Sequence, residues 1–239
     1  MKFTFGIITK NKNNFGSEDP SSSDKTNIME SIESINNLGI PEYEIIVVGG
    51  EDMYNQENIT HFPFDDNINP LWITPKKNMV TKNAKYENIV FTHDYIKFLD
   101  DWYEGFLKFG DDWDICMNTF LNLDGSRFRD WCAWDDPDIC IKGPNVKTKD
   151  GNIVGGLDQR IVLVPYDYKK TNYMYISGTY WVAKKSVMLE EPLDENRWGW
   201  GQQEDVEWSQ RVRDKYRYVM NPHSTIQSLK EKQLQAEIF

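Results

Sequence analysis

Hydrophobic and polar positions divide the start of the chain into a strand, a helix and a second strand. The run Phe3–Thr9 is rich in β-branched and aromatic residues, which is typical of a strand. Apolar residues then recur with helical spacing from Ile28 to Leu38, and a glycine follows as a helix-ending signal. Tyr43–Val48 is almost continuously apolar, as in a strand buried on both faces. The pattern predicts a β-α-β unit in a covered parallel sheet.

The same alternation continues along the rest of the chain. Further strands are predicted over Ile59–Phe64, Glu87–Ile96, Trp113–Leu121, Arg160–Pro165, Tyr173–Ala183 and Tyr216–Met220. The proline of the Arg160–Pro165 strand suggests an edge position, and Lys149–Asn152 is expected to turn a small hairpin. Helices are predicted after Trp72, from Phe98 to Phe106, at 184–188, over Gln203–Tyr216 and in the C-terminal tail, 224–239. We therefore expect an α/β fold with a mixed, mostly parallel central sheet covered by helices on both faces.

Length and charge narrow the class of protein. With 239 residues and 39% hydrophobic content, the chain can build one sizeable core, and we expect a single domain over residues 1–239. A net charge of −11 disfavours binding to nucleic acid or to an anionic membrane. An anionic ligand would then need a local clamp, such as a metal ion or a few placed lysines.

The cysteines and the apolar runs indicate the cellular compartment that we expect for the protein. Cys116, Cys132 and Cys140 are odd in number and show neither metal-ligand spacing nor a disulfide framework, which favours a reducing compartment. No run approaches the roughly 20 apolar residues of a membrane span, and the N-terminus lacks a signal-peptide pattern. We expect a soluble, cytoplasmic protein without an integral membrane segment. The sequence leaves the oligomeric state open.

The stretch Asn196–Trp208 concentrates the candidate chemistry. Trp198 and Trp200 alternate with glycines and offer flat apolar faces of the kind that stack on sugar rings. Glu204 and Asp205 follow in the first turn of a predicted helix, where the positive helix end favours a carboxylate suited to a general base. The alternative is a pair of tryptophans in the core followed by ordinary helix-opening acids.

Two other segments place polar groups at strand ends. Gly49 and Gly50 follow an apolar strand directly, at the carboxyl end where open α/β sheets bind ligands, although two glycines there are more often a turn. The strand from Glu87 ends in His93 and Asp94, so it delivers a carboxylate to the same edge. Asp94 could equally serve as the N-cap of the helix that follows.

Taken in order, these segments resemble glycosyltransferases of the GT-A fold. The Trp-Gly-Trp-Gly run before Glu204 and Asp205 resembles the acceptor segment of galactosyltransferases, although two residues rather than one separate Gly201 from Glu204. A Glu-Asp pair opening a helix is similar to the catalytic motif of inverting family 2 enzymes. The resemblance implies that Asp205 deprotonates the acceptor hydroxyl and that Glu204 contacts the acceptor.

The first half of the chain carries the donor part of this resemblance. A Lys-Lys-Asn run, a helix, and a strand ending in Thr92, His93 and Asp94 resemble the nucleotide-sugar segment, so residues 1–110 are expected to bind the donor. The implied donor-binding residues are Thr9, Gly49, Gly50, Lys77, Asn78, His93, Asp94, Ser177 and Gly178. The alternative for Lys77 is a solvated lysine on the surface. The alternative for Ser177 and Gly178 is a β-bulge at the glycine.

The resemblance also implies a divalent cation, Mn²⁺ or Mg²⁺, that neutralises the leaving diphosphate. The family usually has two acids around one residue at the strand tip, whereas this chain has Asp94 alone. A late histidine completes the metal site in several relatives, and His223 lies in the matching region. A histidine after a proline in a turn is otherwise simply exposed.

Residues 111–223 are expected to form the acceptor and catalytic half. The segment Arg127–Pro137 is too aromatic for a flexible loop and too charged for a core, a combination that suits a surface facing a sugar. Trp131, Trp134, Trp198, Trp200 and Gly201 are therefore the expected acceptor-binding residues. Buried tryptophans that hold a loop are the alternative for Trp131 and Trp134.

We therefore expect a metal-dependent glycosyltransferase that moves a sugar from a UDP-like donor to a hydroxyl of a glycan or glycoconjugate, with inversion. Two other classes remain open. A sugar-nucleotide nucleotidyltransferase would need a Gly-rich, basic phosphate loop after the first strand, which Thr9 and the following residues do not resemble. A noncatalytic carbohydrate-binding relative would bind sugar without hydrolysing a donor, and the single acid at Asp94 keeps that class open.

Overall fold

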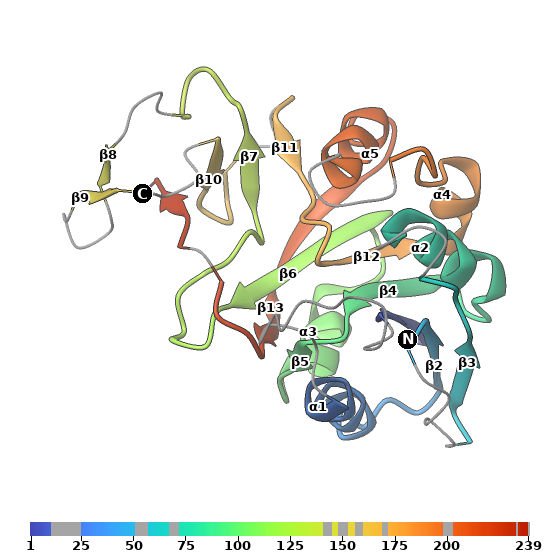
Figure 1. The fold of residues 1–239 in the computed structure, drawn as a ribbon. Coiled ribbons are helices and arrows are strands. Elements are labelled where there is room, and N and C mark those ends of the chain that lie inside the picture. The colour runs from blue at the N-terminus through green and yellow to red at the C-terminus, as the bar shows by residue number, and fades with distance from the viewer. Residues whose placement is uncertain are drawn as a thin grey trace.

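A computed structural model places the chain around an eight-stranded mixed sheet (Figure 1). The structure describes residues 1–10, 25–50, 57–66, 72–140, 145–147, 153–155, 160–168, 172–197, 203–232 and 234–238. In sheet order the strands are β3 (Ile59–Phe62), β2 (Tyr43–Val48), β1 (Phe3–Ile8), β4 (Asn88–His93), β12 (Tyr180–Lys184), β6 (Ile115–Leu121), β13 (Tyr218–Ser228) and β5 (Ile96–Phe98). Only β12 and β5 run against the other strands of this sheet.

The N-terminal β-α-β unit is confirmed. β1 pairs in parallel with β2 on one side and with β4 on the other, so Ile8 lies level with both Val48 and His93. Helix α1 (Lys25–Asn36) connects β1 to β2 and packs its buried isoleucines on the sheet. The apolar runs read from the sequence thus form the central strands of the first half.

Helices cover both faces of the sheet, as predicted (Figure 1). Alternate residues of β2 enter two different cores: Ile45 belongs to one and Ile46 to the other. The first core includes α1 and α3 (Trp102–Phe109), and the second includes α2 (Ile73–Asn83), α4 (Lys185–Glu190) and α5 (Glu204–Val212). The chain is an α/β protein with one mixed, mostly parallel central sheet.

A small four-stranded sheet lies beside the main one (Figure 1). Its order is β11 (Met174–Tyr175), β7 (Cys132–Trp134), β10 (Ile161–Leu163) and β14 (Ala236–Glu237). The edge position predicted for Arg160–Pro165 is wrong, because β10 pairs with β7 and with β14 and its proline lies beyond the paired residues. A separate hairpin joins β8 (Asn145–Lys147) to β9 (Ile153–Gly155) around the predicted turn, which itself lies outside the described residues.

The strand predicted over Tyr173–Ala183 is in fact two strands. β11 belongs to the small sheet and β12 to the main sheet, and a turn through Ser177, Gly178 and Thr179 joins them. The hydrophobic pattern could not show this break, because residues on both sides of the turn are buried.

The C-terminal helix predicted over residues 224–239 is also wrong. β13 continues to Ser228, and β14 follows within the described part of the tail. Ser224, Ile226 and Ser228 are buried at alternate positions, so small polar side chains on the inward face hid the strand pattern. The turn predicted at Asn221 is an irregularity within this strand, where its register with β6 shifts.

One edge of the main sheet positions the candidate site. The parallel strands β1, β2, β4 and β13 end there, and the antiparallel β12 begins there after the 177–179 turn. Because strand ends bring distant residues together, this edge is where α/β sheets hold ligands. In the part of the chain that the structure describes, no helix has both the length and the apolarity to cross a bilayer.

Candidate active site

The backbone of Gly178 contacts side chains of several predicted site residues. Its N–H donates to Oδ2 of Asp205 at 2.8 Å, and its carbonyl accepts from Nζ of Lys77 at 2.5 Å. A Cβ built at position 178 would lie 3.0 Å from Oε1 of Glu204 and 3.1 Å from Oδ2 of Asp205. Glycine is therefore needed here because the two carboxylates approach the backbone closely.

Helix α5 begins at the predicted acids. Glu204 and Asp205 are its first two residues, and Gln203 before them adopts φ 57°, a left-handed conformation that turns the chain into the helix. Oδ1 of Asp205 accepts from the backbone N–H of Val206 at 2.9 Å. The predicted placement of both carboxylates in the first helical turn is confirmed. The helix ends at Val212, which is earlier than predicted.

Opposite charges lie close together at the start of helix α5. Burial raises the pKa of Glu204, the neighbouring Asp205 raises it further, and the charge of Lys77 opposes both. Lys77 is fully buried with its ammonium 4.3 Å from the centre of the Trp181 ring. Burial lowers its pKa to about 8, against the opposing effect of Glu204 and Asp205. The site therefore contains a buried cation beside two carboxylates, of which Glu204 has a raised pKa.

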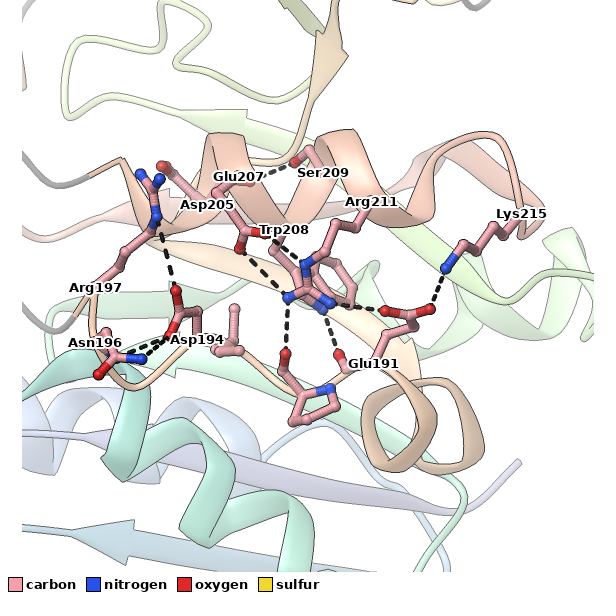
Figure 2. Close-up of polar contacts among 12 residues, drawn as sticks. Glu191, Asp194, Asn196, Arg197, Asp205, Glu207, Trp208, Ser209, Arg211 and Lys215 are labelled. Carbon is pink, nitrogen blue, oxygen red and sulfur yellow. Dashed lines mark hydrogen bonds and ion pairs between the residues drawn. The ribbon is translucent and has the colours of Figure 1, made fainter.

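Ion pairs hold α5 against the segment that precedes it, as Figure 2 shows. Arg211 binds Glu207 one turn earlier at 2.5 Å and Glu191 at 2.7 Å. The indole N–H of Trp208 donates to the carbonyl of Glu191 at 2.6 Å, and Lys215 pairs with the same carboxylate. These contacts fix the axis of α5, and with it the position of the two carboxylates at its start.

Asp94 lies at the tip of β4, where the sequence places it. Its carboxylate is buried and accepts a hydrogen bond from Oγ1 of Thr9 at 2.6 Å. Thr9 comes directly after β1, so the bond joins two neighbouring strand ends. No N-cap role is seen, because the next helix begins at Trp102 after a short strand.

A continuous series of contacts connects Asp94 to Asp205. The N–H of His93, next to Asp94, donates to the carbonyl of Thr179 at 3.2 Å. Thr179 follows Gly178, whose own N–H binds Asp205. The structure thus brings the strand-tip acid and the helix-start acids to one turn of the backbone.

Gly49 and Gly50 form a turn at the end of β2 with φ of 87° and 75°. A Cβ at Gly49 would lie 2.4 Å from the carbonyl oxygen of Thr9 and 3.1 Å from Nζ of Lys76. That ammonium donates to the same carbonyl at 2.6 Å and pairs with the buried Asp66 at 2.6 Å. The glycines therefore leave room for a buried lysine that fixes the end of β1.

The amide of Asn78, a predicted donor-binding residue, contacts the segment that precedes α5. Its amide nitrogen donates to the carbonyl of Leu193 and to Glu195, both at 2.9 Å, and its oxygen accepts from the N–H of Leu193 at 3.1 Å. With its amide engaged on both sides, Asn78 holds the segment before α5. Its role in donor binding stays a prediction.

The predicted metal ligands are not brought together. Nδ1 of His223 lies 3.3 Å from Nζ of Lys108 on α3, within the irregular part of β13. Across the described ranges, no three His, Cys, Asp or Glu side chains gather closely enough to hold a metal ion. Hard divalent cations in proteins prefer several oxygen ligands, so these residues do not fit a metal site.

The predicted acceptor residues divide into three cases. Trp131 is buried, and its ring lies 5.0 Å from that of Tyr218, so the structure favours the core alternative. Trp134 is half-buried, with the guanidinium of Arg160 4.6 Å from its ring centre. Trp198, Trp200 and Gly201 lie outside the described residues.

Charged residues of the Arg127–Pro137 segment pair with one another and with neighbouring segments. Arg127 binds Asp130 at 2.7 Å and Glu237 of β14 at 2.7 Å, and Tyr166 donates to Asp130 at 2.8 Å. This network joins the segment to the small sheet. It explains how so charged a sequence enters a packed region, without any need for a bound sugar.

Lys230 and Lys232, which were not predicted as site residues, lie at the same sheet edge. Their ammonium groups lie 4.8 Å and 4.0 Å from the centre of the Tyr95 ring, next to Asp94. Predicting these two lysines required the full strand β13. Once residues 218–228 are placed in the sheet, residues 230 and 232 must lie at its carboxyl edge.

Comparisons with solved structures agree with this architecture. S. aureus TarS superposes with a TM-score of 0.59 at 14% identity over 96% of this chain and 37% of TarS. TarS residues 1–349 in complex with UDP give 0.56 at 14% identity over 95% of this chain and 60% of that one. GalNAc-T7 with UDP, GalNAc and Mn²⁺ gives 0.60 at 12% identity over 99% of this chain and 44% of that one.

These similarities establish the GT-A fold. The chain spans between 37% and 60% of the length of these structures. No protein-family model and no curated protein matches the sequence.

Proposed function

We propose that the chain is a glycosyltransferase that moves a sugar from a nucleoside-diphosphate donor, a UDP-sugar, to a hydroxyl of a glycan or glycoconjugate, with inversion. The observation that supports this most directly is the backbone turn at Gly178, which joins the helix-start acids to the strand-tip acid. UDP complexes of two structures with the same fold support the choice of donor.

In this proposal Asp205 is the general base and Glu204 a ligand of the acceptor. Asp205 takes the proton of the acceptor hydroxyl while the hydroxyl oxygen forms a bond to the anomeric carbon. The bond between that carbon and the β-phosphate oxygen breaks, and its electron pair leaves with the diphosphate. The Gly178 N–H fixes one oxygen of Asp205, and the charge of Lys77 favours the ionised form of Glu204.

Metal dependence does not enter this mechanism. Asp94 and His223, the two expected ligands, lie in different surroundings, and in the described part of the chain no third ligand joins either one. We therefore derive no step through a cation, and the charge of the leaving group has to be met by other groups.

The proposal is tested with purified protein and a panel of nucleotide sugars, with hydrolysis of the donor as the readout. We expect hydrolysis of at least one UDP-sugar. Asp205→Asn is expected to keep the affinity for UDP and to lower transfer by about 100-fold or more, the usual contribution of a general base. Asp214→Asn, a change further along the same segment, is the matched control. Unchanged turnover in Asp205→Asn would reject Asp205 as the base.

The noncatalytic class remains as a second candidate, because the strand tip carries one acid where related enzymes usually carry two. It predicts that glycans bind with ordinary affinity and that no donor is hydrolysed under any condition. The same panel distinguishes the two, since a binding protein would give no hydrolysis in the wild-type chain as well as in the variant.

A further inference from the structure

Positive charge gathers at the sheet edge of a protein that is acidic overall. The chain has 38 acidic residues against 27 basic ones, so an even distribution would leave every surface negative. Yet Lys230, Lys232 and Arg129 all act electrostatically on one another or on the groups at the tip of β4. Such a concentration against the net charge is the usual feature of a site for an anion.

Two of these cations are fixed by one aromatic ring. Both Lys230 and Lys232 lie over Tyr95, and the exposed Glu231 separates them in the chain. Tyr95 is itself held in place, because its carbonyl accepts from the N–H of Leu229 at 2.8 Å and its ring lies 5.5 Å from that of His93. The lysines thus contact the residue that follows Asp94, and their position follows from the pairing of β13 with β5.

Arg129 shares a second aromatic ring with Lys232: the guanidinium of Arg129 lies 5.3 Å and the ammonium of Lys232 5.9 Å from the centre of the Phe128 ring. The backbone of Arg129 adopts φ 27°, an uncommon conformation that a packed structure imposes on a non-glycine residue. Its charge lowers the pKa of Lys232, as does that of Lys230, after the larger effect of burial. The pKa of Lys232 falls to about 8, which indicates cations crowded together in a poorly solvated place.

We propose that Lys230 and Lys232, assisted by Arg129, bind the diphosphate of the donor and neutralise it as it leaves, without a divalent cation. This inference rests on the proposed function and identifies the group that meets the leaving charge. As the bond between the anomeric carbon and the phosphate oxygen breaks, the negative charge that develops on the diphosphate is stabilised by ammonium groups already in place. The diphosphate in turn relieves the repulsion among the cations.

The test measures binding of UDP by calorimetry in EDTA, for the wild-type chain and for Lys230→Gln, Lys232→Gln and the double variant. Wild type is expected to bind UDP in EDTA and to bind UMP more weakly. Each lysine removed is expected to weaken UDP binding by about tenfold, the contribution of one charge-assisted hydrogen bond. Lys108→Gln is the matched control, since Lys108 is an exposed lysine on α3 beside His223. Circular dichroism verifies that each variant is folded.

The outcomes are distinguishable. UDP binding in EDTA that falls in the lysine variants and not in Lys108→Gln supports the inference. UDP binding that requires Mn²⁺, or that is equal in the double variant and the wild type, overturns the inference and leaves the proposed function standing. Absence of binding to UDP and to other nucleoside diphosphates, with and without Mn²⁺, overturns both.

Discussion

At the scale of single residues, the neighbours Lys76 and Lys77 are both buried but have different roles. The ammonium of Lys76 pairs with Asp66, whose carboxylate is also fully buried. The ammonium of Lys77 instead faces a carbonyl, an indole ring and the partly exposed acids of α5. The first lysine belongs to the framework, and the second belongs to the site.

We predict effects of different size for the two methionine substitutions. Lys76→Met leaves the Asp66 carboxylate buried without its cation, so the free energy of unfolding should fall by about 3–5 kcal/mol. Lys77→Met should change it by less than about 2 kcal/mol, because a buried charge is replaced by an apolar chain of similar length. Urea unfolding of both variants measures the difference. Equal losses would contradict the assignment of the two roles.

Lys77 also gives a prediction for alkaline pH. Its pKa in the folded protein is about 8, below the ordinary value of 10.5, so between these values the unfolded chain binds more protons. Stability therefore rises with pH through this window, by roughly 3 kcal/mol in total from this residue. The difference in unfolding free energy between wild type and Lys77→Met, measured from pH 7 to 10.5, should show this rise. A difference that is flat with pH would refute it.

The pKa of Glu204 gives a prediction for activity. Burial and the charge of Asp205 raise it, and the charge of Lys77 opposes them. Removing that charge in Lys77→Met should raise the pKa further, and the acidic limb of kcat/KM should move to higher pH. A pH profile of donor turnover tests this. An unmoved limb would show that ionisation of Glu204 is not needed.

At the scale of elements, helix α5 depends on a few ion pairs for its position. Arg211 connects it to Glu191 at the end of α4 and to the carbonyl of Pro192 at 2.8 Å (Figure 2). The first turn of α5 carries the acids, and its last turn carries this anchor. Small shifts of the helix would therefore move the carboxylates away from Gly178.

We expect Arg211→Met to lower transfer more than donor binding. Loss of the anchor should lower kcat at least tenfold, because misplacement of a catalytic group by a fraction of an ångström is costly, while the affinity for UDP should be unchanged. Arg217→Met is the control, since Arg217 forms an exposed ion pair with Asp112. An equal fall in UDP affinity would instead indicate general disruption of the fold.

The same scale shows what the sequence could predict. β2 matches the apolar run Tyr43–Val48 because a strand buried on both faces has no competing pattern. β13 was missed beyond Met220, because serines and a threonine fill its inner and outer positions and a proline suggested a turn. The break between β11 and β12 was missed because tertiary contacts of Gly178, and no local signal, create it.

At the scale of the whole molecule, the predicted site lies where helix α5 meets the edge of the main sheet. Asp94, Asp205 and Gly178 could be predicted as a group, because strand ends and helix starts collect at one edge in this fold. Lys230 and Lys232 could not, because their position depends on a long strand that the sequence did not reveal. The contacts that Asn78 makes could not be predicted either, because an amide can serve a ligand or a backbone equally well.

Binding of the donor product at this edge should stabilise the entire chain. UDP at 100 times its dissociation constant is expected to add about 2.7 kcal/mol to the free energy of unfolding. For a chain of this size the melting temperature should rise by about 5–10 °C. Thermal melts with UDP, UMP and buffer alone measure this, and equal melting temperatures in all three would count against a nucleotide site.

The peptide plane at Gly178 has one more consequence. Its N–H donates to the carboxylate that we propose as proton acceptor, and a protonated carboxyl accepts such a bond more weakly. Each proton taken up would therefore weaken the contact between the 177–179 turn and helix α5, and each proton released to solvent would strengthen it again. Proton transfer to Asp205 in a single turnover would in this way change how firmly the turn between β11 and β12 is held.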